Sequence, residues 1–279
     1  MRKAVRYAAA GGEPRIGRLD GDVVVDAGPA PPGGFDASSR SWEAIERARG
    51  AEHPVADVRL LAPVLPPAVA CVGSNYRDHI EETASPVPEH PIIFAKLGSA
   101  IIGPDDPIVV PFDEPQTDYE AELALIIGTE TRRASSERAR RAIGGVTAFN
   151  DVSGRYAQLT SGGGQYTRGK SFDTFGPMGP VVVHVDDLDI DALDISLVLS
   201  GETMQQSSTR HLLFGPAELV EWLSAAWTLR PGDVIATGTP GGVGLVADPP
   251  RFLVAGDEVE VHIDGIGVLR NPVVEEPAA

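Results

Sequence analysis

The sequence predicts a mainly β fold, a mixed-strand sandwich or barrel with few helices, preceded by a small α+β unit. Three observations predict it. From Val69 onward, short apolar runs of β-type residues alternate with turn residues. Turn formers are abundant, with Gly 31 and Pro 24 among 279 residues. Helical patterns are few, which disfavours a doubly wound α/β fold.

Residues 1–62 are expected to form the small N-terminal domain. Within it, short strands flank a turn at Asp20-Gly21-Asp22. Ser41 is the predicted N-cap of a helix from Trp42 to Arg49, and Gly50 is expected to end this helix. Helix is disfavoured next to proline, so a stiff linker is predicted at Pro63, Pro66 and Pro67.

The larger remainder of the chain is expected to consist mainly of strands. Helical segments are predicted as a short turn at 75–82 and as helices from Ser135 to Ala142 and from Pro216 to Ala226. The last residues, Glu275 to Ala279, are expected to form a frayed tail. The predicted strands include 91–95, 101–103, 108–110, 123–127, 181–185, 195–199, 233–236 and 257–263.

Charge and composition exclude several classes of partner. The formal net charge of −17 repels nucleic acid and anionic membrane surfaces, so neither is an expected partner. The single cysteine, Cys71, lies in an apolar run, so it predicts an inert core thiol and no intramolecular disulfide. No apolar stretch approaches the roughly 18 residues of a membrane span, and Arg2 and Lys3 are not followed by a signal-peptide core. We therefore expect a soluble cytoplasmic protein.

Two carboxylates two residues apart form the strongest candidate site. Glu120 and Glu122 adjoin the apolar run 123–127, and they are expected to share one face because side chains alternate along a strand. Like charges on a buried face repel each other and lose hydration, which a cation relieves. Asp151, after the apolar run 146–150, offers a third carboxylate, and such oxygen ligands favour Mg²⁺, Mn²⁺ or Ca²⁺. From spacing alone, an exposed acidic strand edge is an equally good interpretation.

Five motifs occur in order between about residues 69 and 274. They are Gly73-Ser74-Asn75-Tyr76-Arg77-Asp78-His79, Asp118 to Leu123, Asn150-Asp151-Val152-Ser153-Gly154-Arg155, Gly169-Lys170-Ser171-Phe172-Asp173 and Thr237-Gly238-Thr239-Pro240-Gly241-Gly242-Val243-Gly244. Together they resemble the fumarylacetoacetate hydrolase superfamily, and within it the bacterial acylpyruvate or 2,4-diketo acid hydrolases. The resemblance implies a β-rich catalytic domain over residues 69–274 and a homodimer. It also implies that Glu120, Glu122 and Asp151 bind the metal.

His79 and Glu82 are three residues apart, so one helical turn would place them on the same side. A His oriented by a carboxylate is a good general base for water. Spacing alone favours a surface turn with an incidental ion pair. The resemblance instead implies that His79 and Glu82 are catalytic residues on a short lid that orders over the substrate. Glu81 is a competing candidate for the carboxylate.

The resemblance also implies how further side chains act. Lys170, in an expected polar loop, is taken as the catalytic contact to a substrate oxygen or oxyanion, and otherwise it is a solvated lysine. Arg155 is taken as a substrate contact but could instead orient the carboxylates. The Gly-rich stretch from Thr237 to Gly244 lacks a P-loop ending, so we expect it to bind a small carboxylate. The predicted substrate-binding residues are Tyr76, Lys96, Arg155, Gln158 and Thr239.

The implied activity is metal-dependent hydrolysis of a C–C bond in an acylpyruvate or related 2,4-diketo acid, such as fumarylpyruvate or a diketo-deoxy sugar acid, with release of pyruvate. Mg²⁺ or Mn²⁺ is the expected metal, with Ca²⁺ able to substitute. Oxaloacetate-type decarboxylation and 2-hydroxyhepta-2,4-diene-1,7-dioate-type isomerisation are alternatives on the same site. A further alternative is that the chain is a non-catalytic metal-binding protein of this fold. Departures at Ser161-Gly162-Gly163-Gly164, Tyr166 and Ser207-Ser208-Thr209 put the exact substrate in doubt.

Overall fold

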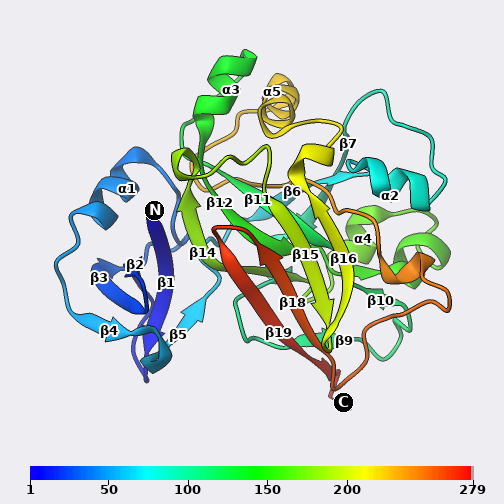
Figure 1. Cartoon of the computed structure of the whole chain (residues 1–279), viewed down its shortest axis with the longest axis horizontal. Coiled ribbons are helices and arrows are strands. Elements are labelled where there is room, and N and C mark those ends of the chain that lie inside the picture. The colour runs from blue at the N-terminus through cyan, green and yellow to red at the C-terminus, as the bar shows by residue number, and fades with distance from the viewer. Residues whose placement is uncertain (278–279) are drawn as a thin grey trace.

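The computed structural model describes residues 1–277 as a β-rich molecule with short helices around its sheets (Figure 1). The helices are α1 (Ser39–Glu46), α2 (Arg77–Glu82), α3 (Ser136–Ala142), α4 (Tyr166–Lys170) and α5 (Pro216–Ala226). The strands are β1 (Lys3–Ala9), β2 (Arg15–Asp20), β3 (Val23–Pro29), β4 (Glu52–Pro54), β5 (Val58–Leu61), β6 (Ala68–Gly73), β7 (Ile92–Leu97), β8 (Ile101–Ile102), β9 (Ile108–Val110), β10 (Thr117–Asp118), β11 (Ala121–Ile127), β12 (Ile143–Asn150), β13 (Ser153–Gly154), β14 (Gly176–His184), β15 (Asp194–Leu199), β16 (Glu202–Ser208), β17 (Val234–Ala236), β18 (Glu258–Ile263) and β19 (Gly267–Glu275).

The strands form one large mixed sheet and two smaller sheets. The large sheet has 12 strands with the path β4-β3-β2-β1-β14-β12-β11-β17-β6-β7, to which β5 is joined through β1 and β8 through β14. A five-stranded sheet has the order β16-β15-β18-β19-β9, and β10 pairs with β13. Most pairs are antiparallel, but β17 with β6, β14 with β8 and β19 with β9 are parallel. The predicted mainly β fold of mixed strands is therefore confirmed.

Strand β11 lies at the centre of the packing. All seven of its residues are buried, which explains why its sequence is almost continuously apolar. Leu123 and Leu125 belong to the core between the two larger sheets, together with Leu197 of β15 and Val261 of β18. The alternate residues, such as Ile126, face a second core that contains residues of β6, β14 and α1. Burial on both faces holds this strand rigidly, and the candidate carboxylates lie at its beginning.

The N-terminal strands extend the large sheet. Strand β1 pairs with β14, with Ala4 opposite Val182, and the blue strands in Figure 1 continue the sheet to one end of the molecule. The linker prolines follow β5, and Pro63 accepts a backbone hydrogen bond from Phe35. The division into two domains at residues 62 and 69 stays a prediction, because backbone pairing crosses from one segment to the other.

Helix α1 begins three residues earlier than the sequence predicted. Ser38, not Ser41, is the N-cap, and its hydroxyl accepts from the Ser41 N–H at 3.3 Å. Ser41 instead donates its hydroxyl to Asp36 at 2.5 Å. Any of the nearby serines has a side chain that can cap a helix. Here Ser38 is the cap, because the Ser41 hydroxyl is bound to Asp36. Gly50 does not end the helix, which stops at Glu46 with Arg47 as its C-cap; Gly50 instead packs against Asp26, where an added Cβ would lie 2.6 Å from the Asp26 carbonyl oxygen.

The other predicted helices and strands are found within a few residues of their expected positions, including α3, α5 and the turn that becomes α2. The frayed tail was wrong at its start: Glu275 ends β19, and the Glu276 N–H donates to the Val110 carbonyl at 3.0 Å. Its last two residues, 278–279, lie outside the described part of the chain.

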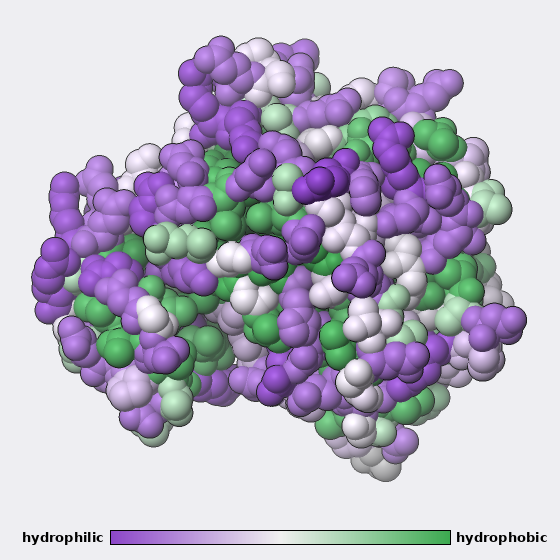
Figure 2. Space-filling model, in the orientation of Figure 1, coloured by the Kyte–Doolittle hydropathy of each residue, from purple (hydrophilic) through white to green (hydrophobic). Residues whose placement is uncertain are grey.

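Polar and charged residues spread across the face drawn in Figure 2, with apolar patches between them. No helix within residues 1–277 is long and apolar enough to cross a bilayer.

Candidate functional site

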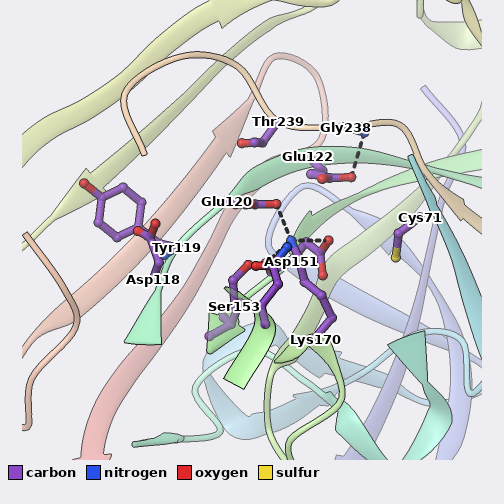
Figure 3. Close-up of polar contacts among 12 residues, drawn as sticks. Cys71, Asp118, Tyr119, Glu120, Glu122, Asp151, Ser153, Lys170, Gly238 and Thr239 are labelled. Carbon is purple, nitrogen blue, oxygen red and sulfur yellow. Dashed lines mark hydrogen bonds and ion pairs between the residues drawn. The ribbon is translucent and has the colours of Figure 1, made fainter. Parts of the chain in front are cut away.

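The three predicted carboxylates meet where β11 begins and β12 ends. The strands pair antiparallel with Glu122 opposite Phe149, and the Asp151 N–H continues the ladder by donating to the Glu120 carbonyl at 2.9 Å. Because paired strands alternate in step, Glu120, Glu122 and Asp151 share one face. One carboxylate oxygen of each lies within 4.8 Å of the others (Figure 3). All three residues are buried.

Two cations hold Glu120 ionised. Lys170 Nζ lies 2.6 Å from its Oε2, and Arg155 Nη2 lies 2.8 Å from its Oε1. Burial disfavours the ionised form of Glu120, but the positive charges of Lys170 and Arg155 have the larger effect. Together they lower the pKa of Glu120 to about 2. Lys170 Nζ also lies 2.9 Å from Asp151 Oδ2, and the two carboxylates raise the pKa of Lys170 despite its burial. Lys170 is therefore a charged group inside the site.

Glu122 lacks such compensation. Its Oε2 accepts a hydrogen bond from the Gly238 N–H at 2.8 Å, but no lysine or arginine among residues 1–277 forms an ion pair with it. Burial raises the pKa of Glu122 well above its ordinary range, and Asp151 and Glu120 add to the effect. Asp151 Oδ1 is likewise buried without a hydrogen-bond donor among the described residues. A cation between these oxygens would supply the positive charge that Glu122 lacks, whereas Asp151 already has the ammonium groups of Lys170 and Lys96 beside it.

The donor set fits a hard divalent cation such as Mg²⁺, Mn²⁺ or Ca²⁺, since all three candidate ligands offer carboxylate oxygen. Cys71 lies nearby in β6 (Figure 3), but burial raises its pKa strongly and keeps it a thiol. The expectation that Cys71 is an inert core residue agrees with its full burial.

Lys170 is the last residue of helix α4, and the expectation of a polar loop was wrong. Helix α4 covers the outer edge of β7, where the Ala95 N–H bonds the Thr167 hydroxyl at 3.4 Å and the Leu97 N–H bonds the Ser171 hydroxyl at 3.1 Å. A five-residue helix is unstable by itself, so these long-range contacts, which local sequence does not reveal, explain the difference. Lys170 Nζ also lies 5.2 Å from the centre of the Phe94 ring.

Lys96 does not contact the cavity, contrary to its predicted role in substrate binding. Its ammonium donates to the carbonyls of Val152 at 3.0 Å, Phe175 at 2.7 Å and Lys170. It also forms an ion pair with Asp151 Oδ1 at 3.0 Å. Its three N–H donors are thus used by the protein, so Lys96 positions Asp151 and the end of α4 rather than a ligand.

Arg155 is fixed by a carboxylate that the sequence analysis did not assign. Asp118 Oδ2 accepts from Arg155 Nε at 2.9 Å, and its Oδ1 accepts from the Gly244 N–H at 2.8 Å. Asp118 thereby joins Arg155 to the Gly-rich stretch. Asp118 is the first residue of the second motif, and this position is the sequence signal that could have identified it. The alternative that Arg155 orients carboxylates is supported, because it contacts both Asp118 and Glu120.

A second residue that the sequence analysis missed is the buried Glu114. Its carboxylate accepts from the N–H groups of Tyr156 at 3.0 Å and Ala157 at 2.7 Å. These begin the short π-helical turn Tyr156–Thr160, which carries Gln158, and Gln158 Oε1 in turn lies 3.3 Å from Arg155 Nη1. Glu114 precedes its partners by more than 40 residues, so no local pattern could identify it.

The predicted His79–Glu82 pair forms within α2. His79 Nδ1 lies 2.7 Å from Glu82 Oε1, and the Glu82 Oε2 accepts from the Gly242 N–H at 2.6 Å. Asp78 bonds the His79 N–H at 2.8 Å and accepts the Ser207 hydroxyl at 2.6 Å, which anchors the start of the helix. Glu81, the competing candidate, is exposed like Glu82, but its side chain makes no hydrogen bond or ion pair within residues 1–277.

A cavity of about 130 Å³ brings most of the predicted residues together. The predicted residues that do not line it are Tyr76, Glu82, Lys96, Glu122 and Asp151. Tyr76 is buried, its hydroxyl has no partner among residues 1–277, and burial raises its pKa. The apolar part of the lining includes Phe94, Leu159 and Leu245. The predicted residues that line the cavity are His79, Glu120, Arg155, Gln158, Lys170 and Thr239.

Comparison with known proteins agrees with this geometry. Residues 68–274 match the family model described as fumarylacetoacetate (FAA) hydrolase C-terminal, and residues 2–63 match one described as Rv2993c-like, N-terminal. The human mitochondrial oxaloacetate tautomerase FAHD2A is 43% identical over 233 residues, which cover 82% of this chain and 74% of the human protein.

Solved structures with the same fold include two bacterial enzymes. The 5-carboxymethyl-2-hydroxymuconate delta-isomerase of Mycobacterium smegmatis is 39% identical with a TM-score of 0.82, and 100% of each chain is covered. The fumarylacetoacetate hydrolase of Exiguobacterium antarcticum is 38% identical with a TM-score of 0.86, covering 99% of this chain and 100% of the other. The resemblance predicted from the five motifs is thereby confirmed, and the chain belongs to the fumarylacetoacetate hydrolase family.

Proposed function

We propose that this protein is a divalent-metal-dependent enzyme that interconverts the keto and enol forms of a small 2-oxo acid of the oxaloacetate type. The observation that carries the proposal is that His79, paired with Glu82, lines the same cavity as Glu120 and Lys170. An acid–base group therefore faces a site rich in charge. The relative named oxaloacetate tautomerase and the neighbour named delta-isomerase support proton transfer, whereas the neighbour named fumarylacetoacetate hydrolase supports hydrolysis.

Substrate recognition follows from the groups around the cavity. The Thr239 hydroxyl and Gln158 provide neutral hydrogen-bonding groups for the substrate carboxylate, and Lys170 and Arg155 provide positive charge. Phe94, Leu159 and Leu245 would surround the remainder of the molecule.

Glu120, Glu122 and Asp151 would hold the metal. When bound, a divalent cation supplies Lewis-acid stabilisation for negative charge on the 2-oxo oxygen. Lys170 adds a fixed positive charge, and it stays protonated because its pKa is raised by Asp151 and Glu120 despite burial.

His79 would transfer the proton. The bond between His79 Nδ1 and Glu82 fixes the ring and leaves Nε2 available for proton transfer in the cavity that His79 lines. Nε2 would take a proton from C3 of the keto acid, and the electron pair of the C–H bond would form the C2–C3 double bond. The proton would then pass to the C2 oxygen to give the enol, and the reverse sequence would restore the ketone. Glu82 stabilises the imidazolium that exists between the two steps.

Hydrolysis of an acylpyruvate is the second candidate. The same His79–Glu82 pair favours it, because a base oriented by a carboxylate can deprotonate water for attack on the C4 carbonyl. Cleavage of the C3–C4 bond would then release pyruvate and a carboxylic acid.

As the resemblance implies, we also propose that the protein acts as a homodimer.

The test is a comparison of substrates with one enzyme preparation. Oxaloacetate enol–keto conversion, oxaloacetate decarboxylation and acylpyruvate cleavage would be followed with Mg²⁺ and after chelation. We expect metal-dependent acceleration of the enol–keto conversion. Rapid pyruvate release from acylpyruvates without accelerated tautomerisation would reject the first proposal in favour of the second, and no turnover of any of them would reject both.

A further inference from the structure

A buried glutamine, Gln205 in β16, joins the strand of the metal ligands to the Gly-rich stretch. Its Oε1 accepts from the Ala121 N–H at 2.9 Å, between Glu120 and Glu122 in the chain. Its Nε2 lies 2.8 Å from Thr239 Oγ1 and 2.8 Å from the Pro240 carbonyl oxygen. Gln205 is 1% exposed, so these bonds are shielded from exchange with water.

The partners of the Gln205 amide fix its orientation. The Ala121 N–H can only donate and the Pro240 carbonyl can only accept, so a flipped amide would leave both buried groups without a partner. The nitrogen that bonds Pro240 is therefore also the atom that faces Thr239. In that contact the amide donates, and the Thr239 oxygen accepts.

We propose that Gln205 is a positioning residue that makes the Thr239 hydroxyl a hydrogen-bond donor toward the substrate. A hydroxyl carries one hydrogen, and no group within residues 1–277 accepts it from Thr239. Thr239 is 4% exposed and lines the cavity, so its hydrogen is available to a ligand. The site then selects an acceptor oxygen, such as that of a carboxylate, because a ligand donor there would leave the Thr239 hydrogen unsatisfied.

The position of Thr239 agrees with this selection. In Figure 3, Thr239 and Gly238 lie on the opposite side of the two glutamates from Lys170. Because Thr239 and Lys170 both line the cavity, a small acid bound there could accept from Thr239 with one oxygen and face the Lys170 ammonium with another. This inference rests on the proposed function, which assigns Thr239 to the substrate.

The test is a double-mutant cycle on the full chain, with the dissociation constant of oxalate in saturating Mg²⁺ measured by calorimetry. Thr239→Val should weaken oxalate binding by about tenfold or more, since it removes a hydrogen bond to a charged ligand. Gln205→Met should weaken it by about three- to tenfold, because Thr239 loses its fixed orientation. In the Thr239→Val background, Gln205→Met should cause no further loss.

Matched measurements separate positioning from general support of the loop. Gln206→Met changes the exposed neighbour in the same strand and should leave binding unaltered. Mg²⁺ affinity without oxalate should be unchanged in Gln205→Met. If that variant does not fold, Gln205→Glu retains an acceptor for Ala121 but presents an acceptor to Thr239, so it should draw the Thr239 hydrogen away from the ligand and weaken oxalate binding more with Thr239 present than in the Thr239→Val background.

The outcomes are distinct. Equal losses from the Gln205 change in both backgrounds would overturn the inference and leave the proposed function standing. Failure of the unmodified protein to bind oxalate in Mg²⁺ would overturn the proposed function, and this inference with it.

Discussion

The Glu82 carboxylate accepts a hydrogen bond from the Gly242 N–H at 2.6 Å. Its other oxygen pairs with His79 Nδ1 at 2.7 Å, so one carboxylate both orients the imidazole and joins α2 to the Gly-rich stretch that carries Thr239. The position of α2 and the orientation of the proposed base are therefore coupled. A movement of α2 away from the Gly-rich stretch would break the Glu82–Gly242 bond and carry the His79–Glu82 pair with it.

This coupling predicts how the segment 76–90 responds to ligand. Oxalate with Mg²⁺ should slow hydrogen exchange there, because His79 would gain a partner in the cavity. Glu82→Ala should raise exchange in the same segment and reduce the protection by oxalate. Glu81→Ala is the matched control and should have little effect, since the Glu81 side chain bonds no group within residues 1–277 whereas Glu82 bonds His79 and Gly242. Unchanged exchange, despite measured oxalate binding, would exclude a lid function for this segment.

His79→Ala should separate reactions that need a base from one that does not. Loss of a positioned acid–base group typically lowers a rate about 10²–10⁴-fold, and we expect this for oxaloacetate tautomerisation and for any acylpyruvate cleavage. Decarboxylation of oxaloacetate requires no proton abstraction and should fall much less. Mg²⁺ affinity should be unchanged, because His79 is outside the carboxylate cluster. Equal losses in all reactions would argue against His79 as the base.

Glu122→Gln should abolish metal binding and the added stability that bound metal gives. In the unmodified protein, Mg²⁺ should raise the melting temperature, and ligand linkage gives about 2.7 kcal/mol at a hundredfold excess over the dissociation constant. The variant should lose this response together with turnover. In chelated buffer it should be at least as stable as the parent, because burial and two neighbouring carboxylates already raise the pKa of Glu122. A variant that kept full Mg²⁺-dependent activity would contradict the ligand assignment.

Local pattern predicted most of the fold because most elements carry their own signal. The apolar run of β11 and the Pro216 start of α5 are readable from neighbouring residues. Two features could not be predicted in this way: the strand pair β10 and β13, and the helix α4. Each depends on partners that are distant in sequence. The same reason explains why the N-terminal strands, which look like a separate unit in sequence, join the large sheet through β1 and β14.

The candidate site was predictable where side chains share a strand or a helical turn. Alternation placed Glu120 beside Glu122, and a three-residue spacing placed His79 beside Glu82. Lys96 was misjudged because its partners, the carbonyls of Val152, Lys170 and Phe175, are backbone groups with no sequence signature. Glu114 and Gln205 were missed for a similar reason, as each bonds backbone N–H groups far along the chain.

Asp26 in β3 should make stability depend on pH in the acidic range. Its carboxylate accepts from Arg15 Nε at 2.7 Å and from the Tyr7 hydroxyl at 2.8 Å, and the Arg15 bond foremost lowers its pKa to about 2. A folded-state pKa below the ordinary value of about 3.9 stabilises the protein at higher pH, and the effect is lost as the pH falls toward 2. Asp26→Asn should therefore lower the melting temperature at pH 7 and progressively less below about pH 4. Asp57→Asn, at an exposed site, is the control, and an equal loss at every pH would contradict the linkage.

Lys96→Met should destabilise the protein more than any change to an exposed lysine or arginine. Lys96 is fully buried, holds three carbonyls and lies 3.0 Å from Asp151 Oδ1, so its removal leaves a buried charge and several acceptors uncompensated. Removal of one partner from a buried ion pair typically costs about 3–5 kcal/mol, which urea unfolding in chelated buffer would measure. Arg168→Met, on the exposed side of α4, should change stability by less than about 0.5 kcal/mol. Should Lys96→Met instead remain as stable as the parent and lose only oxalate affinity, Lys96 would be a substrate contact and its positioning role would be wrong.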